Sequence, residues 1–155
     1  MAFNGLVHAI GKAIKLSAPT LRKASIHLEL DLAEDLPHIY GDLQLLEQVF
    51  LNLISNACAA LGHTKGARWI RMTSLAHRGS VIVHIEDSGP GIPPELRGRV
   101  FDPFFTTESQ GTGIGLGICK HIVSDHRGEI TFTDSPLGGT RFTVSIPVEK
   151  PKRAW

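Results

Sequence analysis

The chain has 155 residues, with 16 Lys and Arg against 15 Asp and Glu, which leaves a formal net charge of +1. This length is sufficient for one compact domain with its own hydrophobic core. The balanced charge argues against a basic nucleic-acid-binding surface and against an acidic tail. Polar residues interrupt every apolar run within a few positions, so no segment is expected to span a bilayer. Cys58 and Cys119 lie in apolar helical contexts outside any CxxC motif, which indicates buried free thiols of a cytoplasmic protein.

The first predicted element is an amphipathic helix over residues 6–22, and Pro19 is expected to break or kink its last part. Because lysines line one side of this helix, the N-terminus does not resemble a signal peptide. Residues 26–32 (IHLELDL) alternate apolar with polar side chains, which predicts a strand. After a turn-rich connector, Asp42 is expected to cap a second helix over residues 43–61. The apolar stripe of that helix consists of Leu46, Val49, Phe50, Leu53, Ile54, Ala57 and Leu61.

The rest of the chain alternates predicted strands and short helices. In chain order these are two strands joined by a turn at residues 77–80, a short helix near residues 95–100, a helix over about residues 114–125, and a hairpin with its turn at residues 135–139. The tail after residue 148 is expected to fray. This order predicts an α/β (α+β) two-layer sandwich with a mixed, mostly antiparallel sheet and helices on one face.

Two asparagines interrupt the apolar stripe of the second helix. Asn52 and Asn56 are four residues apart and therefore project from the same face. Asparagine is unfavourable in helix interiors because its amide competes with the backbone for hydrogen bonds. One interpretation is that both amides cap neighbouring loops. The other is that their oxygens face a ligand such as Mg²⁺, which prefers hard oxygen donors and is coordinated by substrate phosphates at the same time.

The stretch IEDSGPGI, residues 85–92, ends a predicted strand in a carboxylate followed by turn residues. This arrangement is expected to leave Asp87 in a pocket at the end of the sheet. A carboxylate there can accept a hydrogen bond from an amino group such as that of adenine. Guanine would present a carbonyl oxygen instead, and the two facing acceptors would both lack a donor. An ordinary Asx-type turn is the alternative interpretation.

Two further stretches precede the third helix. The phenylalanines of VFDPFFTTE, residues 100–108, are interpreted mainly as core or lid anchors. In GTGIGLGI, residues 111–118, glycine occupies every second position directly before a helix. Such glycines expose successive backbone N–H groups where the helix dipole is positive, which favours phosphate binding. A dinucleotide-binding fold and a P-loop are excluded, because no strand precedes the run and no Gly-Lys-Ser/Thr follows it.

Taken in order, NLISNA, DSGPGI, FDPFF, GTGIGLGI and GGTRFTVSIP resemble the N, G1, F, G2 and G3 boxes of bacterial sensor histidine kinases, members of the GHKL superfamily. The resemblance covers nearly the whole chain and implies a Bergerat-type fold that holds ATP between the second helix and a lid. It also implies transfer of the γ-phosphoryl group to a histidine on a separate dimerisation domain, and from there to a response-regulator receiver domain. Neither nucleic acid nor direct membrane contact is expected, and the location implied is the cytoplasm.

The resemblance also implies roles for individual residues. Asn56 would coordinate Mg²⁺ with Asn52 beside the phosphates, and both would be catalytic. Asp87 would bind the adenine amino group with the help of water and Thr140. The residues implied to bind nucleotide are Asn52, Asn56, Asp87, Gly89, Gly91, Ile92, Phe101, Thr107, Gly111, Thr112, Gly113, Ile114, Gly115, Leu116 and Thr140.

Asn52 occupies the position at which hydrolysing members of the superfamily carry a glutamate. Because an amide cannot act as a base at neutral pH, the sequence favours phosphotransfer over efficient hydrolysis. The chain departs from the kinase pattern at Ala59 and Glu108, where relatives often have lysine. Arg97, Arg99 and Lys65 are candidate substitutes for the missing charge. The two departures motivate an alternative, an ATP-binding regulatory module without phosphotransfer. A hydrolysing ATPase of the same superfamily is a third possibility.

None of the eight histidines has the acidic neighbour typical of a phosphoacceptor site, and the long helical hairpin that carries such a site is not predicted. The chain is therefore expected to be an excised catalytic module. Residues 1–18 are expected to be a linker remnant that packs on or leads into the domain. Residues 19–148 are the expected ATP-binding domain, and residues 149–155 the tail.

Overall fold

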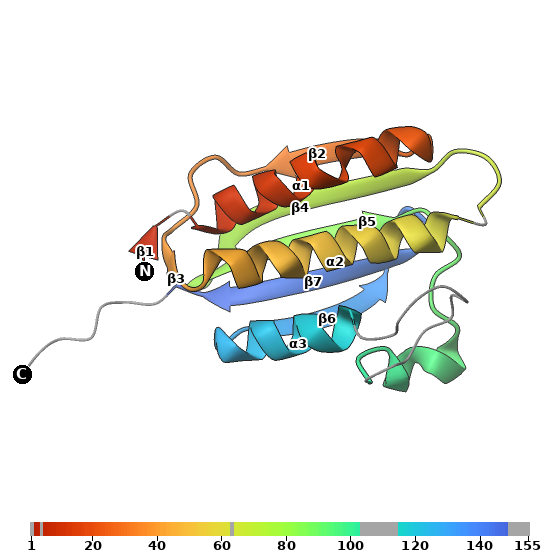
Figure 1. Cartoon of the computed structure of the whole chain (residues 1–155). Coiled ribbons are helices and arrows are strands. Elements are labelled where there is room, and N and C mark those ends of the chain that lie inside the picture. The colour runs from red at the N-terminus through yellow and green to blue at the C-terminus, as the bar shows by residue number, and fades with distance from the viewer. Residues whose placement is uncertain (1, 4, 63, 103–114, 149–155) are drawn as a thin grey trace, which may run out of the picture.

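In a computed structural model of the chain, which describes residues 2–3, 5–62, 64–102 and 115–148, three α-helices lie on one side of a β-sheet (Figure 1). The helices are α1 (Gly5–Lys23), α2 (Leu43–Leu61) and α3 (Gly115–Asp125), with a 3₁₀ helix η1 (Pro94–Arg99). The strands of the main sheet are β2 (His27–Leu32), β4 (Trp69–His77), β5 (Ser80–Asp87), β6 (Glu129–Asp134) and β7 (Thr140–Pro147). Strands β1 (Ala2–Phe3) and β3 (Ile39–Tyr40) form a separate antiparallel pair.

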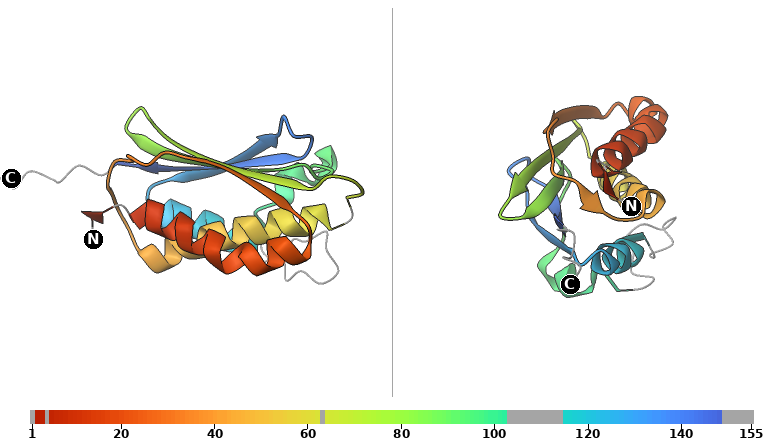
Figure 2. Two further views of the ribbon diagram at one scale, coloured as in Figure 1. Left: turned by 90° about the horizontal axis from the view of Figure 1, so that it is seen from above. Right: turned by 90° about the vertical axis from the view of Figure 1, so that its left-hand side faces the viewer.

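The main sheet has the strand order β2-β4-β5-β7-β6. Strand β2 runs parallel to β4, and every other pair is antiparallel. The view from above in Figure 2 shows all three helices on the same side of this sheet. The predicted two-layer sandwich with a mixed, mostly antiparallel sheet is therefore confirmed.

Alternation along the strands explains why only one face is covered by helices. In β5, Val81, Val83 and Ile85 are buried while Ile82 and His84 are only half-buried. The same period of two appears in β4 and β7. The buried residues of α2 are the seven that its sequence pattern predicts, and they join the strand side chains in one core. Burial of this apolar area is the main stabilising term of the fold.

The boundaries of α2 and of the β4–β5 hairpin follow from local chemistry. The Asp42 carboxylate accepts hydrogen bonds from the backbone N–H groups of Gln44 and Leu45, at 3.0 and 3.1 Å, and so caps α2 as predicted. Between β4 and β5, Arg78 and Gly79 both have positive φ, 51° and 78°. Two consecutive left-handed residues make the tight turn that suits the twist of a hairpin.

Pro19 was expected to break or kink the first helix. It does not break the helix, because α1 runs through Pro19 to Lys23. Pro19 and Lys15, whose carbonyl loses its helical hydrogen bond, are both exposed, so water can satisfy that carbonyl. Leu6, Ala9, Ile10 and other residues of α1 are buried in the core. The helix is thus packed on α2 along its length.

Two smaller features differ from expectation. The connector before α2 contains strand β3, whose pairing with β1 was not predicted, since two-residue strands carry no readable period.

Of the two free cysteines, Cys119 is buried and Cys58 half-buried. Burial raises the pKa of Cys119 to about 12, so it stays a thiol. Within the described residues no helix is both long and apolar enough to cross a membrane.

Candidate functional site

Asp87 is the last residue of β5, and its side chain is only 3% exposed. Its carboxylate accepts hydrogen bonds from the backbone N–H groups of Gly89, at 2.9 Å, and of Thr140 at the start of β7. Burial raises the pKa of Asp87, and these two hydrogen bonds oppose that rise. The bond from Gly89 is the Asx turn of the alternative interpretation. A carboxylate has about four acceptor sites, so capacity for a ligand amine remains.

Gly89 and Gly139 lie so close to the Asp87 carboxylate that a side chain at either position would not fit. A Cβ on Gly139 would overlap the Asp87 carboxylate and lie 2.7 Å from the backbone nitrogen of Gly89. A Cβ on Gly89 would lie 2.9 Å from the same carboxylate and 3.2 Å from the carbonyl oxygen of Ala60 in α2. The end of β5, the start of β7 and the end of α2 therefore meet around one buried carboxylate.

Asn52, Asn56 and Ala60 follow one another at intervals of four along α2 and form a stripe on one side of the helix. At one end of this stripe, the Asn52 side-chain amide donates to the carbonyl of Gly115, at 3.4 Å, and accepts from Gln48, at 2.7 Å. At the other end, Ala60 lies against Gly89. The half-buried Asn56 lies between them, so the stripe connects the first residue of α3 to the Asp87 pocket.

The start of α3 is thus beside α2, as Figure 1 also shows. Gly115 and Leu116 are its first residues, and Leu116 packs against the core. A helix N-terminus carries unpaired backbone N–H groups and the positive end of the dipole. The predicted site residues Thr107, Gly111, Thr112, Gly113 and Ile114, and also Glu108, lie outside the described residues.

Phe101 lies in an aromatic cluster at the end of the sheet. Its ring centroid is 6.0 Å from that of Phe132 and 6.3 Å from that of Phe142, and the Lys120 ammonium is 5.3 Å from the ring. Its carbonyl oxygen lies 3.2 Å from the position of a Cβ on Gly117. These contacts are the anchoring expected from the structural interpretation, and contact with nucleotide stays a prediction.

The loop after β5 is fastened to the β6–β7 hairpin through Arg97. Its guanidinium donates to the carbonyl of Ile92, at 3.2 Å, and to the carboxylate of Asp134, at 2.6 Å. Gly91 has φ +79°, which favours glycine there. Arg97, suggested above as a substitute for the missing lysine charge, is therefore engaged on the hairpin side of the loop.

The donor set can be compared with the needs of Mg²⁺. Among the described residues no three His, Cys, Asp or Glu side chains gather in a way that could hold a metal ion. Asn56 carries a hard amide oxygen and belongs to the stripe of α2 whose Ala60 lies against Gly89. Mg²⁺ keeps several waters and binds substrate phosphates, so one protein oxygen suits an ion that arrives with a nucleotide.

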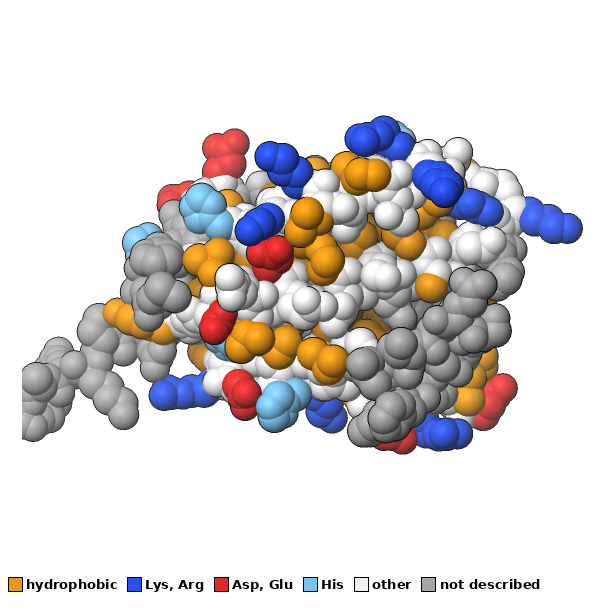
Figure 3. All heavy atoms as spheres, viewed as in Figure 1, with side chains coloured by type: hydrophobic (Ala, Val, Ile, Leu, Met, Phe, Trp, Pro, Cys, Tyr) orange, Lys and Arg blue, Asp and Glu red, His pale blue; other side chains and the backbone are white. Residues whose placement is uncertain are grey.

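A separate groove lies between α1 and α2, lined by Val7, Leu16, Leu43 and other residues, including Lys12 and Lys15. Figure 3 shows hydrophobic side chains gathered along these two helices. Asn52 contacts α3, so the candidate site lies on the other side of α2. The groove is therefore not part of it.

Sequence reasoning missed Glu86 and Ser135, which are joined by a hydrogen bond close to Asp87. Glu86 belongs to the IEDSGPGI stretch but has no role in the sequence pattern. Its importance depends on which residues lie opposite it in neighbouring strands, and a single sequence does not contain that register.

The family model of histidine kinase-, DNA gyrase B- and HSP90-like ATPases matches residues 41–150. The C4-dicarboxylate transport sensor protein DctS of Rhodobacter capsulatus is 34% identical over 149 residues, which are 96% of this chain and 23% of that protein. The sensory histidine kinase/phosphatase NtrB of Salmonella typhimurium is 32% identical, covering 93% of this chain and 43% of that protein. The chain thus spans less than half the length of these relatives.

Among solved structures, the catalytic domain of histidine kinase ThkA is similar over 95% of this chain and 94% of its own, with a TM-score of 0.84 and 35% identity. ThkA in complex with the response regulator protein TrrA also matches, with a TM-score of 0.78 and 33% identity over 96% of this chain and 42% of that one. Together with the five-stranded sheet and the buried Asp87, these likenesses show that the chain belongs to the histidine kinase-, DNA gyrase B- and HSP90-like ATPase family, as a catalytic module of the sensor histidine kinase type.

Proposed function

We propose that this module binds Mg·ATP between α2, the start of α3 and the end of β5, and transfers the γ-phosphoryl group to a histidine on a separate dimerisation domain. The observation that carries the proposal is the buried carboxylate of Asp87, held by the N–H groups of Gly89 and Thr140 beside the asparagine stripe of α2. Membership of an ATPase family supports nucleotide as the ligand.

Asp87 is the group that would recognise adenine. Its carboxylate accepts from the exocyclic amine, with Thr140 and a water beside it, and Gly89, Gly91 and Ile92 shape the pocket. Guanine would place a carbonyl opposite the carboxylate, and an unsatisfied buried acceptor pair of this kind costs about 1–3 kcal/mol. The pocket therefore favours adenine nucleotides.

The phosphates would lie along the stripe towards α3. Asn52 and Asn56 face them from α2, and the N-terminus of α3 with its preceding glycines offers backbone N–H groups. Mg²⁺, held by Asn56, would neutralise charge on the phosphates. In the transfer, the bond between the γ-phosphorus and the bridging oxygen breaks as a bond to an imidazole nitrogen forms, and ADP leaves with the electron pair.

Asn52 explains why transfer is favoured over hydrolysis. Its amide accepts from Gln48 and donates to Gly115, and it has no basic group with which to take a proton from water. Catalysis then consists of positioning and charge stabilisation, which supply most of the rate enhancement in phosphoryl transfer.

The test supplies the dimerisation domain of the same kinase in trans with [γ-³²P]ATP and Mg²⁺. We expect label on the acceptor histidine, no label when that histidine is replaced by Gln, and little label when Asp87→Asn is assayed at ATP below the wild-type dissociation constant. Saturable ATP binding without any label would reject phosphotransfer and favour the regulatory module, for which the half-buried Ala59 is the supporting observation, because it leaves α2 without a lysine near the phosphates. Steady phosphate release by the module alone would favour a hydrolysing ATPase.

Partners and location are also part of the proposal. The complex of ThkA with a response regulator supports a receiver domain as the next phosphoryl acceptor. Because ATP and receiver domains are found in the cytoplasm, we place the module there, without contact to nucleic acid or membrane.

A further inference from the structure

Glu86 is a buried carboxylate on the face of the sheet that none of the three described α-helices covers (Figure 2). Its side chain is 1% exposed, although it points away from the helices, opposite to its neighbour Asp87. Moving an unpaired carboxylate out of water costs several kcal/mol. The contacts of Glu86 must therefore account for its burial.

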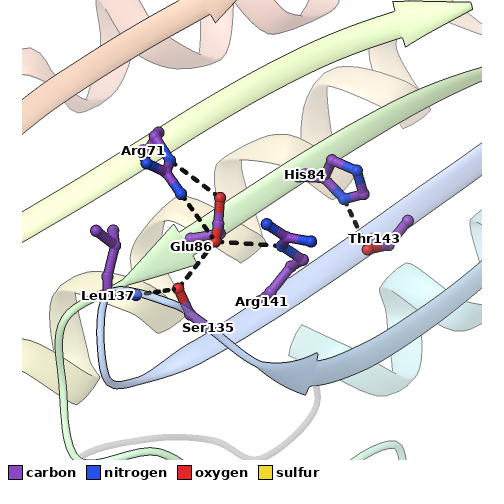
Figure 4. Close-up of polar contacts among 7 residues, drawn as sticks. All are labelled: Arg71, His84, Glu86, Ser135, Leu137, Arg141 and Thr143. Carbon is purple, nitrogen blue, oxygen red and sulfur yellow. Dashed lines mark hydrogen bonds and ion pairs between the residues drawn. The ribbon is translucent and has the colours of Figure 1, made fainter.

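These contacts come from both neighbouring strands and from one turn (Figure 4). In the sheet register, Glu86 lies directly opposite Arg71 of β4 and Arg141 of β7. Arg71 donates to the two carboxylate oxygens at 3.1 and 3.4 Å, and Arg141 Nε forms an ion pair with Oε1 at 3.2 Å. The Ser135 hydroxyl donates to the same Oε1 at 2.9 Å.

The two arginines more than offset the single negative charge of Glu86, and Ser135 adds a connection to the β6–β7 turn. Within that turn, the Ser135 N–H donates to the Gly139 carbonyl at 2.8 Å, and the Leu137 N–H donates to the Ser135 hydroxyl oxygen at 3.0 Å. Ser135 is itself buried, 8% exposed. Glu86 thus holds the residue that closes the turn.

This turn delivers Gly139 and Thr140 to Asp87. Gly139 is packed so closely against the Asp87 carboxylate that a Cβ would overlap it, and the next residue, Thr140, donates its N–H to that carboxylate. A continuous set of contacts therefore runs from Glu86 on one face of the sheet, through Ser135 and Gly139, to Asp87 on the other.

We propose that Glu86 is a positioning residue which, through Ser135, fixes the β6–β7 turn against Asp87 and so sets the orientation of the adenine-binding carboxylate. The inference rests on the proposed function, because it assumes that Asp87 binds the adenine amine. Glu86 and Asp87 are adjacent residues on opposite faces of β5, so the turn that Glu86 holds on one face reaches Asp87 on the other.

The test compares the affinity of Mg·ATP with that of the triphosphate of purine riboside, which lacks the exocyclic amine. Calorimetry gives both dissociation constants for the wild type, Glu86→Gln and Ser135→Ala. Glu29→Gln is the matched control, because Glu29 also acts on Arg71 electrostatically but is an exposed residue of β2. Thermal unfolding and circular dichroism establish that each variant is folded.

We expect Glu86→Gln to weaken the binding of ATP about 10-fold, equivalent to about 1.4 kcal/mol. The binding of purine riboside triphosphate should weaken about 2-fold or less. The preference for ATP therefore falls in Glu86→Gln, falls less in Ser135→Ala, and is unchanged in Glu29→Gln. If Glu86→Gln does not fold, Ser135→Ala decides, because it removes only the hydroxyl, with its hydrogen bonds to Glu86 and from the Leu137 N–H, and leaves both arginine ion pairs of Glu86 in place.

Equal weakening of both nucleotides, or no weakening of either, would overturn the positioning role and leave Glu86 as part of the sheet's stability. The proposed function fails separately: in that case the wild type shows no preference for ATP, and Asp87→Asn changes nothing. A preference that is lost in Asp87→Asn and kept in Glu86→Gln and Ser135→Ala would retain the adenine site and reject the inference.

Discussion

Adjacent carboxylates on β5 respond to burial in opposite ways because their partners differ. At Asp87, burial raises the pKa more than two backbone hydrogen bonds lower it. At Glu86, burial alone would raise the pKa, but Arg71, Ser135 and Arg141 outweigh it and hold the pKa below its ordinary value. Asp87 thus has two backbone donors as partners, whereas Glu86 has two arginines and a serine hydroxyl from the surrounding strands and turn.

Asp87→Asn is expected to weaken ATP binding about 10- to 100-fold, since a hydrogen bond to a charged group contributes about 1.5–3 kcal/mol. The change removes the charge and places an NH₂ donor opposite the adenine amine. Calorimetry measures the effect, with Asp31→Asn, an exposed carboxylate of β2, as the control. Unchanged ATP affinity in Asp87→Asn would remove Asp87 from the site.

Glu86 is expected to make the stability of the wild type depend on pH below neutrality. Because its folded pKa lies below the unfolded value, the contribution is complete above the ordinary carboxyl pKa and is lost as pH falls through the lowered pKa. Glu86→Gln should unfold at a lower temperature near pH 7 and lose less stability on acidification to about pH 3. Parallel curves of unfolding temperature against pH would contradict this assignment.

At the scale of the elements, the start of α2 and the end of α1 each contain one residue whose replacement has a predictable effect on stability. Asp42→Ala is expected to destabilise the domain by about 1 kcal/mol, because two N–H groups at the start of α2 lose their acceptor. Urea unfolding measures the difference. Asp42→Ser, which retains a capping oxygen, should be close to the wild type. An equal loss of unfolding free energy in both variants would show that the Asp42 carboxylate does not stabilise the domain by capping α2.

The C-terminus of α1 ends in a left-handed residue that is not glycine. Ser25 has φ 56°, and the next residue, Ile26, donates its N–H to the Leu21 carbonyl at 2.9 Å. Ser25→Gly should therefore stabilise the domain by about 0.5–1 kcal/mol. The same change at Ser17, inside the helix, should destabilise it by about 0.5 kcal/mol. Urea unfolding that gives the same sign for both would contradict the backbone explanation.

Elements with a strong local signal could be predicted from the sequence. The bounds of α2 follow from its apolar period and from Asp42, and the β4–β5 hairpin follows from alternation and its turn. The β1–β3 pair is too short for such a signal, and the passage of α1 through Pro19 depends on which side of the helix meets solvent. At the site, motif order indicated Asp87 and the asparagines, whereas the connection from Glu86 through Ser135 depends on cross-strand register.

For the molecule as a whole, the asparagine stripe of α2 brings together parts of the chain that are far apart in sequence. It contacts Gly115 at one end and Gly89 at the other, and Gly89 lies beside Gly139. A ligand that spans this stripe would bind at once to α2, α3, the loop after β5 and the β6–β7 hairpin. We therefore expect nucleotide to stabilise the whole domain rather than one segment.

The most direct test is an amide chemical-shift titration of the isotopically labelled domain with a non-hydrolysable ATP analogue, with and without Mg²⁺. The account predicts saturable shifts at Gly89, Gly91 and Thr140 in both titrations, and Mg²⁺-dependent shifts of the Asn56 side-chain amide. Shifts confined to the groove between α1 and α2, or no saturable shift at any of these groups, would contradict it.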